Sequence, residues 1–227
     1  MPQRPRAIAF DVVETLFSLE GLRPRLAAAG LLNDALELWF ARLLRDAFAL
    51  DAVGVYPPFR AVAQGALAVS FAQRGIDPTE EQVAHILEGF GDLTPDPDVE
   101  PAFRAAREAG VRIVTLSNGG AAVTRGLLAK AGLDGFVEQV LSIDDVRRWK
   151  PRADVYHHAA ASLGVVPADL ALVAAHAWDV LGARRAGLTT GWVSRLERRF
   201  QPAMGAPDVE DTTLHGVVAG LLRLPSP

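Results

Sequence analysis

The fold of this chain is decided by the stretch Arg6-Ala-Ile-Ala-Phe-Asp11-Val-Val-Glu-Thr15-Leu16, a short apolar run that ends in one acid and then turns. Ile8 to Phe10 predict a buried strand of a parallel sheet, because the run is continuously apolar, brief and followed by turn residues. Ligands of open parallel sheets bind beyond the carboxyl ends of the strands, so Asp11 would lie where chemistry occurs. An acid at this point can also serve only to cap a turn, and the stretch alone leaves both interpretations open.

Length and composition predict a globular protein with a sizeable core. The chain has 227 residues, of which 50% are hydrophobic, enough for one core domain with an insertion or for two small domains. The net charge of -4 and the scattered basic residues offer no surface suited to nucleic acid. The absence of cysteine excludes disulfides, thiolate nucleophiles and cysteine-bound zinc, and it fits a reducing compartment.

The hydropathy pattern gives no sign of membrane attachment. No apolar run approaches the roughly 18 residues that span a bilayer, and the N-terminus lacks a signal-type apolar segment. We therefore expect a soluble, cytoplasmic protein whose partner is a small molecule, and which binds neither membrane nor nucleic acid.

Residues 17–93 are helical in pattern and contain no convincing strand, which predicts a helical domain inserted after the first strand. Helices are expected over 35–50 and 58–73. A third begins at Asp77-Pro78-Thr79-Glu80, where Asp77 would be the N-cap and Pro78 the first helical residue. The proline-rich and acidic segment 94–98 then reads as a linker.

After this linker the pattern alternates between strand and helix, which is typical of an α/β fold with a parallel sheet. The predicted strands are 111–116, 137–142, 170–175 and 190–193, and the predicted helices are 99–109, 121–131, 152–163, 178–186 and 213–222. Residues 1–16 and 94–227 would form the core, residues 17–93 the cap. The segment 195–207 is polar and contains proline.

Three further groups of polar residues follow predicted strands. Ser117-Asn118-Gly119-Gly120 brings a hydroxyl, an amide and flexible backbone N–H groups to a strand end. Lys150 precedes the helix that carries Tyr156, and the segment from His176 to Asp179 adds a second carboxylate. Singly, these residues have ordinary interpretations as a turn, a surface lysine and a helix N-terminal acid. Their shared location beyond the strand ends favours a common site.

The order Asp11, Ser117, Lys150, Asp179, with a helical insertion after the first strand, resembles the haloacid dehalogenase superfamily over nearly the whole chain. Within it, the chain is most similar to the L-2-haloacid dehalogenase (type II) subgroup. The matching motifs are Phe10-Asp11 through Thr15-Leu16-Phe17, Leu116-Ser117-Asn118-Gly119, Lys150-Pro151 with Val155-Tyr156, and Ala177-Trp178-Asp179 followed by Gly182-Ala183-Arg184.

The resemblance implies a Rossmann-like core with a helical cap, no cofactor, and Asp11 as covalent nucleophile. The Asp11 carboxylate would displace halide from a 2-haloacid, and water would then hydrolyse the aspartyl ester to a 2-hydroxy acid. The subgroup also implies a homodimer. The expected catalytic residues are Asp11, Thr15, Ser117, Asn118, Lys150, Tyr156, His176 and Asp179. The expected substrate-binding residues are Val13, Glu14, Phe40, Arg42, Phe59, Gly119 and Trp178.

Two other functions stay open. Phosphatases of the superfamily carry an acid two residues after the nucleophile, where this chain has Val13, and usually another at the position of Ala175. Mg²⁺ needs oxygen ligands, so the two losses place metal-independent dehalogenation ahead of a Mg²⁺-dependent phosphatase, for which Asp11 and Asp179 would have to suffice. A binding protein without catalysis is the third possibility, because a fold does not determine function.

The chain also departs from the subgroup where substrate is chosen. The arginine that receives halide corresponds to Phe40, and Arg42, Arg45 or Arg60 would have to reach in or else lie on a solvated helix face. Glu14 replaces a glycine and is either an extra acid in the site or a solvent-facing turn residue. His176 replaces an asparagine and either activates the hydrolytic water or simply bonds to backbone at a strand end.

Overall fold

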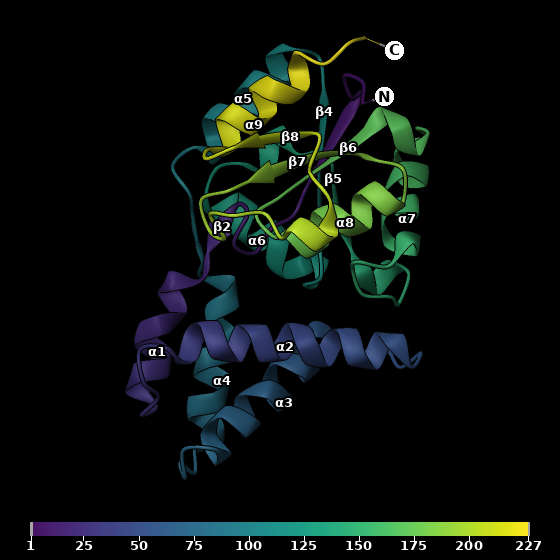
Figure 1. The fold of residues 1–227 in the computed structure, drawn as a ribbon. Helices are drawn as coiled ribbons and strands as arrows, with labels where there is room; N and C mark the ends of the chain where they lie inside the picture. The colour runs from purple at the N-terminus through teal and green to yellow at the C-terminus, as the bar shows by residue number, and fades with distance from the viewer. Residues whose placement is uncertain (1, 227) are drawn as a thin grey trace.

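The computed structural model describes residues 2–226 and contains a six-stranded sheet in the order β5-β4-β1-β6-β7-β8 (Figure 1). Every neighbouring pair is parallel, and the four residues of β1 at its centre are fully buried. The predicted α/β class with a parallel sheet is confirmed. The strands are β1 (Ala7–Phe10), β4 (Arg112–Ser117), β5 (Gln139–Ser142), β6 (Leu170–Ala174), β7 (Thr189–Val193) and β8 (Val209–Asp211).

Helices cover both faces of this sheet, which explains why its central strands β1 and β6 are apolar throughout rather than alternating. Helices α5 and α9 lie side by side on one face, and α7 and α8 lie together on the other (Figure 1). Phe10 of β1 packs on Phe103 of α5 with ring centroids 4.9 Å apart. The helices are α5 (Val99–Glu108), α6 (Ala121–Lys130), α7 (Ala153–Leu163), α8 (Ala177–Arg185) and α9 (Leu214–Leu222).

Four more helices lie together below the sheet in Figure 1 and occupy the segment predicted to be a cap. They are α1 (Arg23–Ala28), α2 (Ala35–Ala52), α3 (Phe59–Ala72) and α4 (Glu80–Glu88). Trp39 joins two of them, because its indole N–H on α2 donates to the Ala63 carbonyl on α3 at 2.9 Å. None of the helices in residues 2–226 combines the length and apolar character that crossing a bilayer requires.

The chain leaves and re-enters the sheet domain through a two-stranded antiparallel ribbon. Its strands are β2 (Phe17–Ser18) and β3 (Thr94–Pro95), with Phe17 opposite Pro95 and Ser18 opposite Thr94. The sequence predicted no strand in 17–93. It missed β2 because a strand of two residues shows no periodicity. The short 3-10 helices are Leu19–Leu22, Gly89–Gly91, Asp134–Phe136, Ile143–Asp145, Pro167–Asp169 and Pro202–Met204.

Two further features of local structure differ from the sequence-based predictions. β8 was not predicted, because only one of its three residues is apolar and an edge strand needs no buried face. The N-cap of α4 is Thr79 rather than Asp77. The Thr79 hydroxyl accepts from the Gln82 N–H at 3.2 Å, and the Gln82 side chain accepts from the Thr79 N–H at 2.9 Å. This reciprocal pair is a capping box, which satisfies two otherwise unpaired N–H groups.

The cap assignment predicts different effects for two neighbouring substitutions. Thr79→Ala should lower the free energy of unfolding by about 1 kcal/mol, because the Gln82 N–H loses its acceptor. Asp77→Ala, at an exposed residue outside the cap, should leave it unchanged. Urea denaturation of both variants is the measurement, and equal losses would contradict the assignment.

Candidate active site

The register of the central strands brings the predicted site residues to one edge of the sheet. Phe10 of β1 lies opposite Thr115 of β4 and Val173 of β6, so the residues after these positions leave the sheet together. The Asp11 N–H still donates to the Val173 carbonyl at 3.0 Å, which anchors the acid at the strand end. Its side chain is 8% exposed. The position of Asp11 therefore follows directly from strand pairing.

Lys150 forms the centre of the site. Its Nζ donates to Asp11 Oδ1 at 2.8 Å, to Asp179 Oδ2 at 2.6 Å and to the Leu116 carbonyl at 2.9 Å, which uses all three ammonium protons. The side chain is fully buried. Burial alone would lower the pKa of Lys150, but the two adjacent carboxylates outweigh it and raise that pKa. Lys150 is thus a buried cation, and the interpretation as a surface lysine is wrong.

Asp179 is the second carboxylate that contacts Lys150. Its second oxygen, Oδ1, accepts from the Tyr156 hydroxyl at 2.6 Å, and the carboxylate is fully buried. Burial raises the pKa of Asp179, with a further rise from Asp11, while the Lys150 ammonium opposes both. Burial also raises the pKa of Tyr156 well above its usual value, so the phenol stays a proton donor. Asp179 and Tyr156 are therefore placed to position Lys150.

Thr15 fixes the other oxygen of the Asp11 carboxylate. Its hydroxyl donates to Asp11 Oδ2 at 2.7 Å and accepts from the Ala175 N–H at 2.9 Å. This contact ties the turn after β1 to the end of β6. Each Asp11 oxygen thus has one internal donor, and a carboxylate oxygen has a second lone pair available for a reacting carbon.

The segment after β4 supplies hydrogen-bond donors beside Asp11. The Ser117 hydroxyl accepts from the Gly119 N–H at 2.8 Å, and the Asn118 side-chain oxygen accepts from the Lys150 N–H at 3.1 Å. The Ser142 hydroxyl donates to the Gly119 carbonyl at 2.9 Å, which fixes the turn before α6. Within the described residues, the Ser117 hydroxyl proton and the Asn118 amide protons have no acceptor, so they are available to a substrate.

Glu14 and His176 form a pair on the same side of the nucleophile. His176 Nε2 lies 2.8 Å from Glu14 Oε2, and Nδ1 lies 4.0 Å from Asp11 Oδ2. Burial opposes protonation of His176, but Glu14, Asp11 and Glu197 together raise its pKa. Glu14 therefore faces the site, and the solvent-facing interpretation is wrong. Sequence reasoning missed Glu197, which lies in the polar, proline-containing segment 195–207.

The backbone at Glu14 is unusual. Its φ of 66° is in the left-handed region, which costs a residue other than glycine roughly 1 to 2 kcal/mol. Such strain persists only where the surrounding structure maintains it, and it is concentrated at functional sites. The side chain of this strained residue is the one that contacts His176.

Aromatic side chains form the wall around His176. Its ring centroid lies 6.3 Å from that of Phe40 on α2 and 5.5 Å from that of Trp178 on α8. Phe59 stacks on Trp149 rather than on His176, with its ring centroid 6.1 Å from that of Trp149. Val13 is half-buried in the turn after β1, where it forms an isolated bridge with Phe17.

Arg42 does not join the cluster around Asp11. Its guanidinium donates to the Ser70 hydroxyl and to the Gln73 side-chain oxygen, both at 2.7 Å, inside the contact between α2 and α3. The alternative expectation, a solvated helix face, also fails because Arg42 is buried. Helical periodicity assigns charged residues to the outside, and it cannot show that a neighbouring helix offers two acceptors.

Sequence reasoning also missed the contacts that join the cap to the Lys150 segment. Asp51 at the end of α2 accepts from the Trp149 backbone N–H at 3.1 Å, and the Trp149 indole donates to the Pro57 carbonyl at 3.2 Å. The Tyr56 hydroxyl hydrogen-bonds to Asp144 on the core side. No local signal marks these pairs, because their members are far apart in the sequence.

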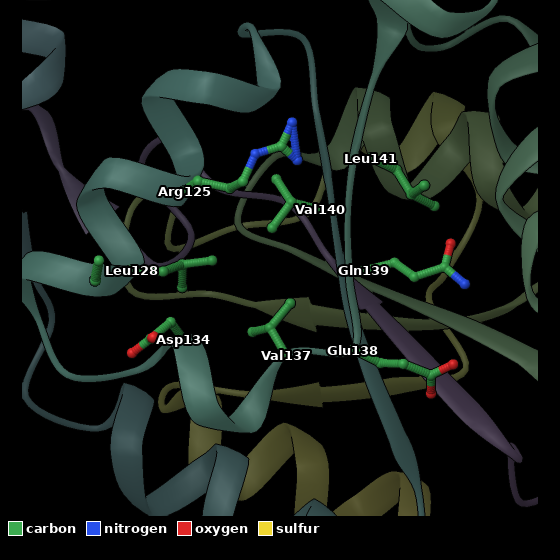
Figure 2. A pocket seen from close by; sticks show the side chains of 9 residues that line it. Arg125, Leu128, Asp134, Val137, Glu138, Gln139, Val140 and Leu141 are labelled. Carbon is green, nitrogen blue, oxygen red and sulfur yellow. The ribbon is translucent and has the colours of Figure 1, made fainter.

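A separate pocket of about 580 Å³ lies on the edge strand β5, between that strand and α6 (Figure 2). Arg125 and Leu128 of α6 and the side chains of 137–141 line it. These lining residues do not include the predicted site residues, so this pocket is distinct from the cluster around Asp11.

Replacing Lys150 should destabilise the fold as well as the site. Lys150→Met leaves two buried carboxylates without their cation, which should cost roughly 3 to 5 kcal/mol at pH 8. The loss should shrink toward pH 5, because without the ammonium only the Tyr156 hydrogen bond opposes the rise that burial causes in the pKa of Asp179, and protonation removes the buried charge. Urea denaturation at both pH values measures this.

Lys130 offers a matched control, because it is the only other lysine and is 63% exposed in a surface ion pair with Asp92. Lys130→Met should cost less than about 1 kcal/mol at either pH. Equal losses in the two variants would contradict the central role of Lys150.

Comparison with known proteins identifies the family of this chain. The model of the haloacid dehalogenase-like hydrolases matches residues 5–187. The chain is 28% identical to haloacetate dehalogenase H-2 of Moraxella sp. (strain B), covering 93% of this chain and 96% of that protein. It is 30% identical to the (S)-2-haloacid dehalogenase of Pseudomonas sp. (strain YL), and the match covers 94% of this chain and 93% of that protein.

A solved structure supports the same assignment. The L-2-haloacid dehalogenase of Xanthobacter autotrophicus with chloropropionic acid covalently bound superposes with a TM-score of 0.86, at 26% identity, over 95% of this chain and 97% of that one. Both the resemblance to the superfamily and the fold expected from it are confirmed. The chain belongs to the haloacid dehalogenase-like hydrolase family.

Proposed function

We propose that this hydrolase is a 2-haloacid dehalogenase in which the Asp11 carboxylate displaces the halide. The observation that carries the proposal is the buried Asp11 carboxylate, held by Lys150 at Oδ1 and by Thr15 at Oδ2. A nucleophile for substitution at carbon must be ionised, oriented and poorly solvated, and this arrangement meets all three needs. Relatives that are named 2-haloacid dehalogenases match nearly the full chain, which supports the proposal.

The reaction has two steps. An Asp11 oxygen forms a bond to C2 of the substrate while the carbon–halogen bond breaks, and the electron pair of that bond leaves with the halide. Water then adds to the Asp11 Cγ, and the ester C–O bond at Cγ breaks to release the 2-hydroxy acid. The free donors of Ser117 and Asn118 would bind the substrate carboxylate, with the first turn of α6 nearby.

We further propose that catalysis needs no metal or other cofactor. The Lys150 ammonium lies between Asp11 and Asp179, where it supplies the positive charge that a cation would bring. Within residues 2–226, no group of three His, Cys, Asp or Glu side chains could hold a metal ion. The positions where the superfamily's phosphatases carry extra acids are Val13 and Ala175, which supports carbon–halogen chemistry over phosphoryl transfer.

The side of the site that receives the halide is aromatic. Phe40 is 7% exposed and packs near the ring of His176, which in turn packs near Trp178, so an aromatic ring occupies the position of the guanidinium. Stabilisation of a departing anion by a preorganised donor is commonly worth about 3 to 4 kcal/mol. We therefore expect displacement to depend strongly on the leaving group, with bromide released faster than chloride and chloride faster than fluoride.

Halide release tests the proposal directly. The enzyme should release halide from 2-bromo- and 2-chlorocarboxylates with EDTA present, and Asp11→Asn should lower the rate by about a thousandfold or more because the nucleophile is lost. Asp154→Asn, on the exposed surface of α7, is the matched control and should keep full activity. Mg²⁺-dependent release of phosphate without halide release would instead support the phosphatase function.

We also propose that the enzyme is a cytoplasmic homodimer. The absence of cysteine suits a reducing compartment. An apolar groove of about 500 Å³ on the cap, between α2 and α3, supports the dimer. The exposed side chains of Val53, Val55 and Val69 lie on or beside these helices, and a second copy would cover them.

Sedimentation tests the dimer. The unaltered protein should sediment at twice the chain mass of 24.2 kDa, and Val55→Glu should shift it toward the monomer because a charge enters the apolar groove. Val166→Glu is the control, because Val166 is 61% exposed but lies outside the groove. A monomer without any substitution would contradict this assembly.

A further inference from the structure

We propose that Glu14 and His176 form a general-base dyad that activates the water which hydrolyses the Asp11 ester. This inference rests on the proposed dehalogenase function and assigns a role to two residues that depart from the subgroup pattern. It concerns only the second step of the reaction, because the first step needs no base.

The geometry places a free imidazole nitrogen next to the future ester. His176 Nδ1 is buried and has no hydrogen-bond partner within residues 2–226, and it lies 4.0 Å from Asp11 Oδ2. That separation is too long for a direct hydrogen bond, but one water can bond to both atoms. A water in that place would be close to Asp11 Cγ, the atom that it must attack.

Glu14 determines which imidazole nitrogen can act as the base. Its Oε2 lies 2.8 Å from Nε2 and accepts the Nε2 proton, so in the neutral ring the lone pair is on Nδ1. A carboxylate on one nitrogen also raises the basicity of the other. The rings of Phe40 and Trp178 flank the imidazole and hold its orientation.

The charges around His176 change at the right stage of the reaction. Burial lowers the pKa of His176, but the groups that face it outweigh burial and raise that pKa. The acidic groups are Glu14 in the turn after β1, Asp11 at the end of β1 and Glu197 after β7, whereas the flanking α2 and α8 present uncharged rings. Esterification removes the Asp11 charge, so the imidazole releases its proton more readily when a base is needed.

The proton balance of the hydrolysis closes on these two residues. Water oxygen bonds to Asp11 Cγ while His176 Nδ1 takes a proton from that water. The bond between Asp11 Cγ and the ester oxygen that is attached to the substrate's C2 then breaks. The departing alkoxide takes the proton from Nδ1 and becomes the 2-hydroxy acid. The new Asp11 carboxyl group loses its proton to solvent, which restores the carboxylate. Glu14 keeps the Nε2 proton throughout.

The backbone at Glu14 supports a role for its side chain. With a φ of 66°, this position favours glycine, yet the chain has a glutamate there. Glu14→Gly therefore removes the dyad and relieves backbone strain together, so we expect this variant to fold at least as stably as the unaltered protein.

Single-turnover kinetics separate the two steps. His176→Asn should release one halide per site at a rate close to that of the unaltered enzyme, whereas decay of the ester, followed by intact mass, should slow by about a hundredfold. Glu14→Gln and Glu14→Gly should slow the same decay by about tenfold. In the unaltered enzyme the decay rate should rise with pH and level off above the pKa of His176, and His176→Asn should abolish that rise.

The outcomes distinguish the dyad from the proposed function. Ester decay at the unaltered rate in His176→Asn would overturn the dyad and leave the dehalogenase function intact. A slower halide burst with unchanged decay would overturn it too, because His176 would then act on the leaving group. If the unaltered enzyme formed neither halide nor ester, both proposals would fail.

Discussion

The buried ammonium of Lys150 lies between two buried carboxylates, and the remainder of the site depends on this contact. Asp11 and Asp179 cannot both be ionised at such burial without a cation, since each would lose its hydration without compensation. Tyr156 donates to the other oxygen of Asp179, so Lys150 contacts one oxygen of each carboxylate. The core therefore presents a single oriented carboxylate to the cap, and this is the arrangement that nucleophilic substitution at carbon requires.

The cap completes the site by closing over the nucleophile. α2 carries Phe40 to the imidazole, and Asp51 at its end holds the backbone of Trp149, the residue before Lys150. The same helix thus brings an aromatic ring to the residues around Asp11 and holds the segment that carries Lys150. The cap contacts the core here through buried polar atoms. Such hydrogen bonds fix orientation more strictly than apolar packing does.

The departures from the subgroup lie together in space. Phe40, Glu14 and His176 are distant in the sequence, yet their side chains meet beside Asp11. Under the proposed mechanism, an aromatic ring in place of a cation would make halide departure harder, whereas the added carboxylate–imidazole pair would assist the hydrolysis that follows. In that mechanism the two steps would depend on residues that the motif match alone does not indicate.

The sequence by itself determined the α/β class, the inserted helical segment and the nucleophile, because apolar periodicity and turn residues act locally and β1 is read from four adjacent residues. Only the tertiary structure decided the direction of Arg42, the strand β8 and the pairing of Glu14 with His176, which lie 162 positions apart. The physical reason is that strand register and helix packing place distant side chains in contact. A local pattern specifies which residues are buried, but it does not specify the partners that they meet.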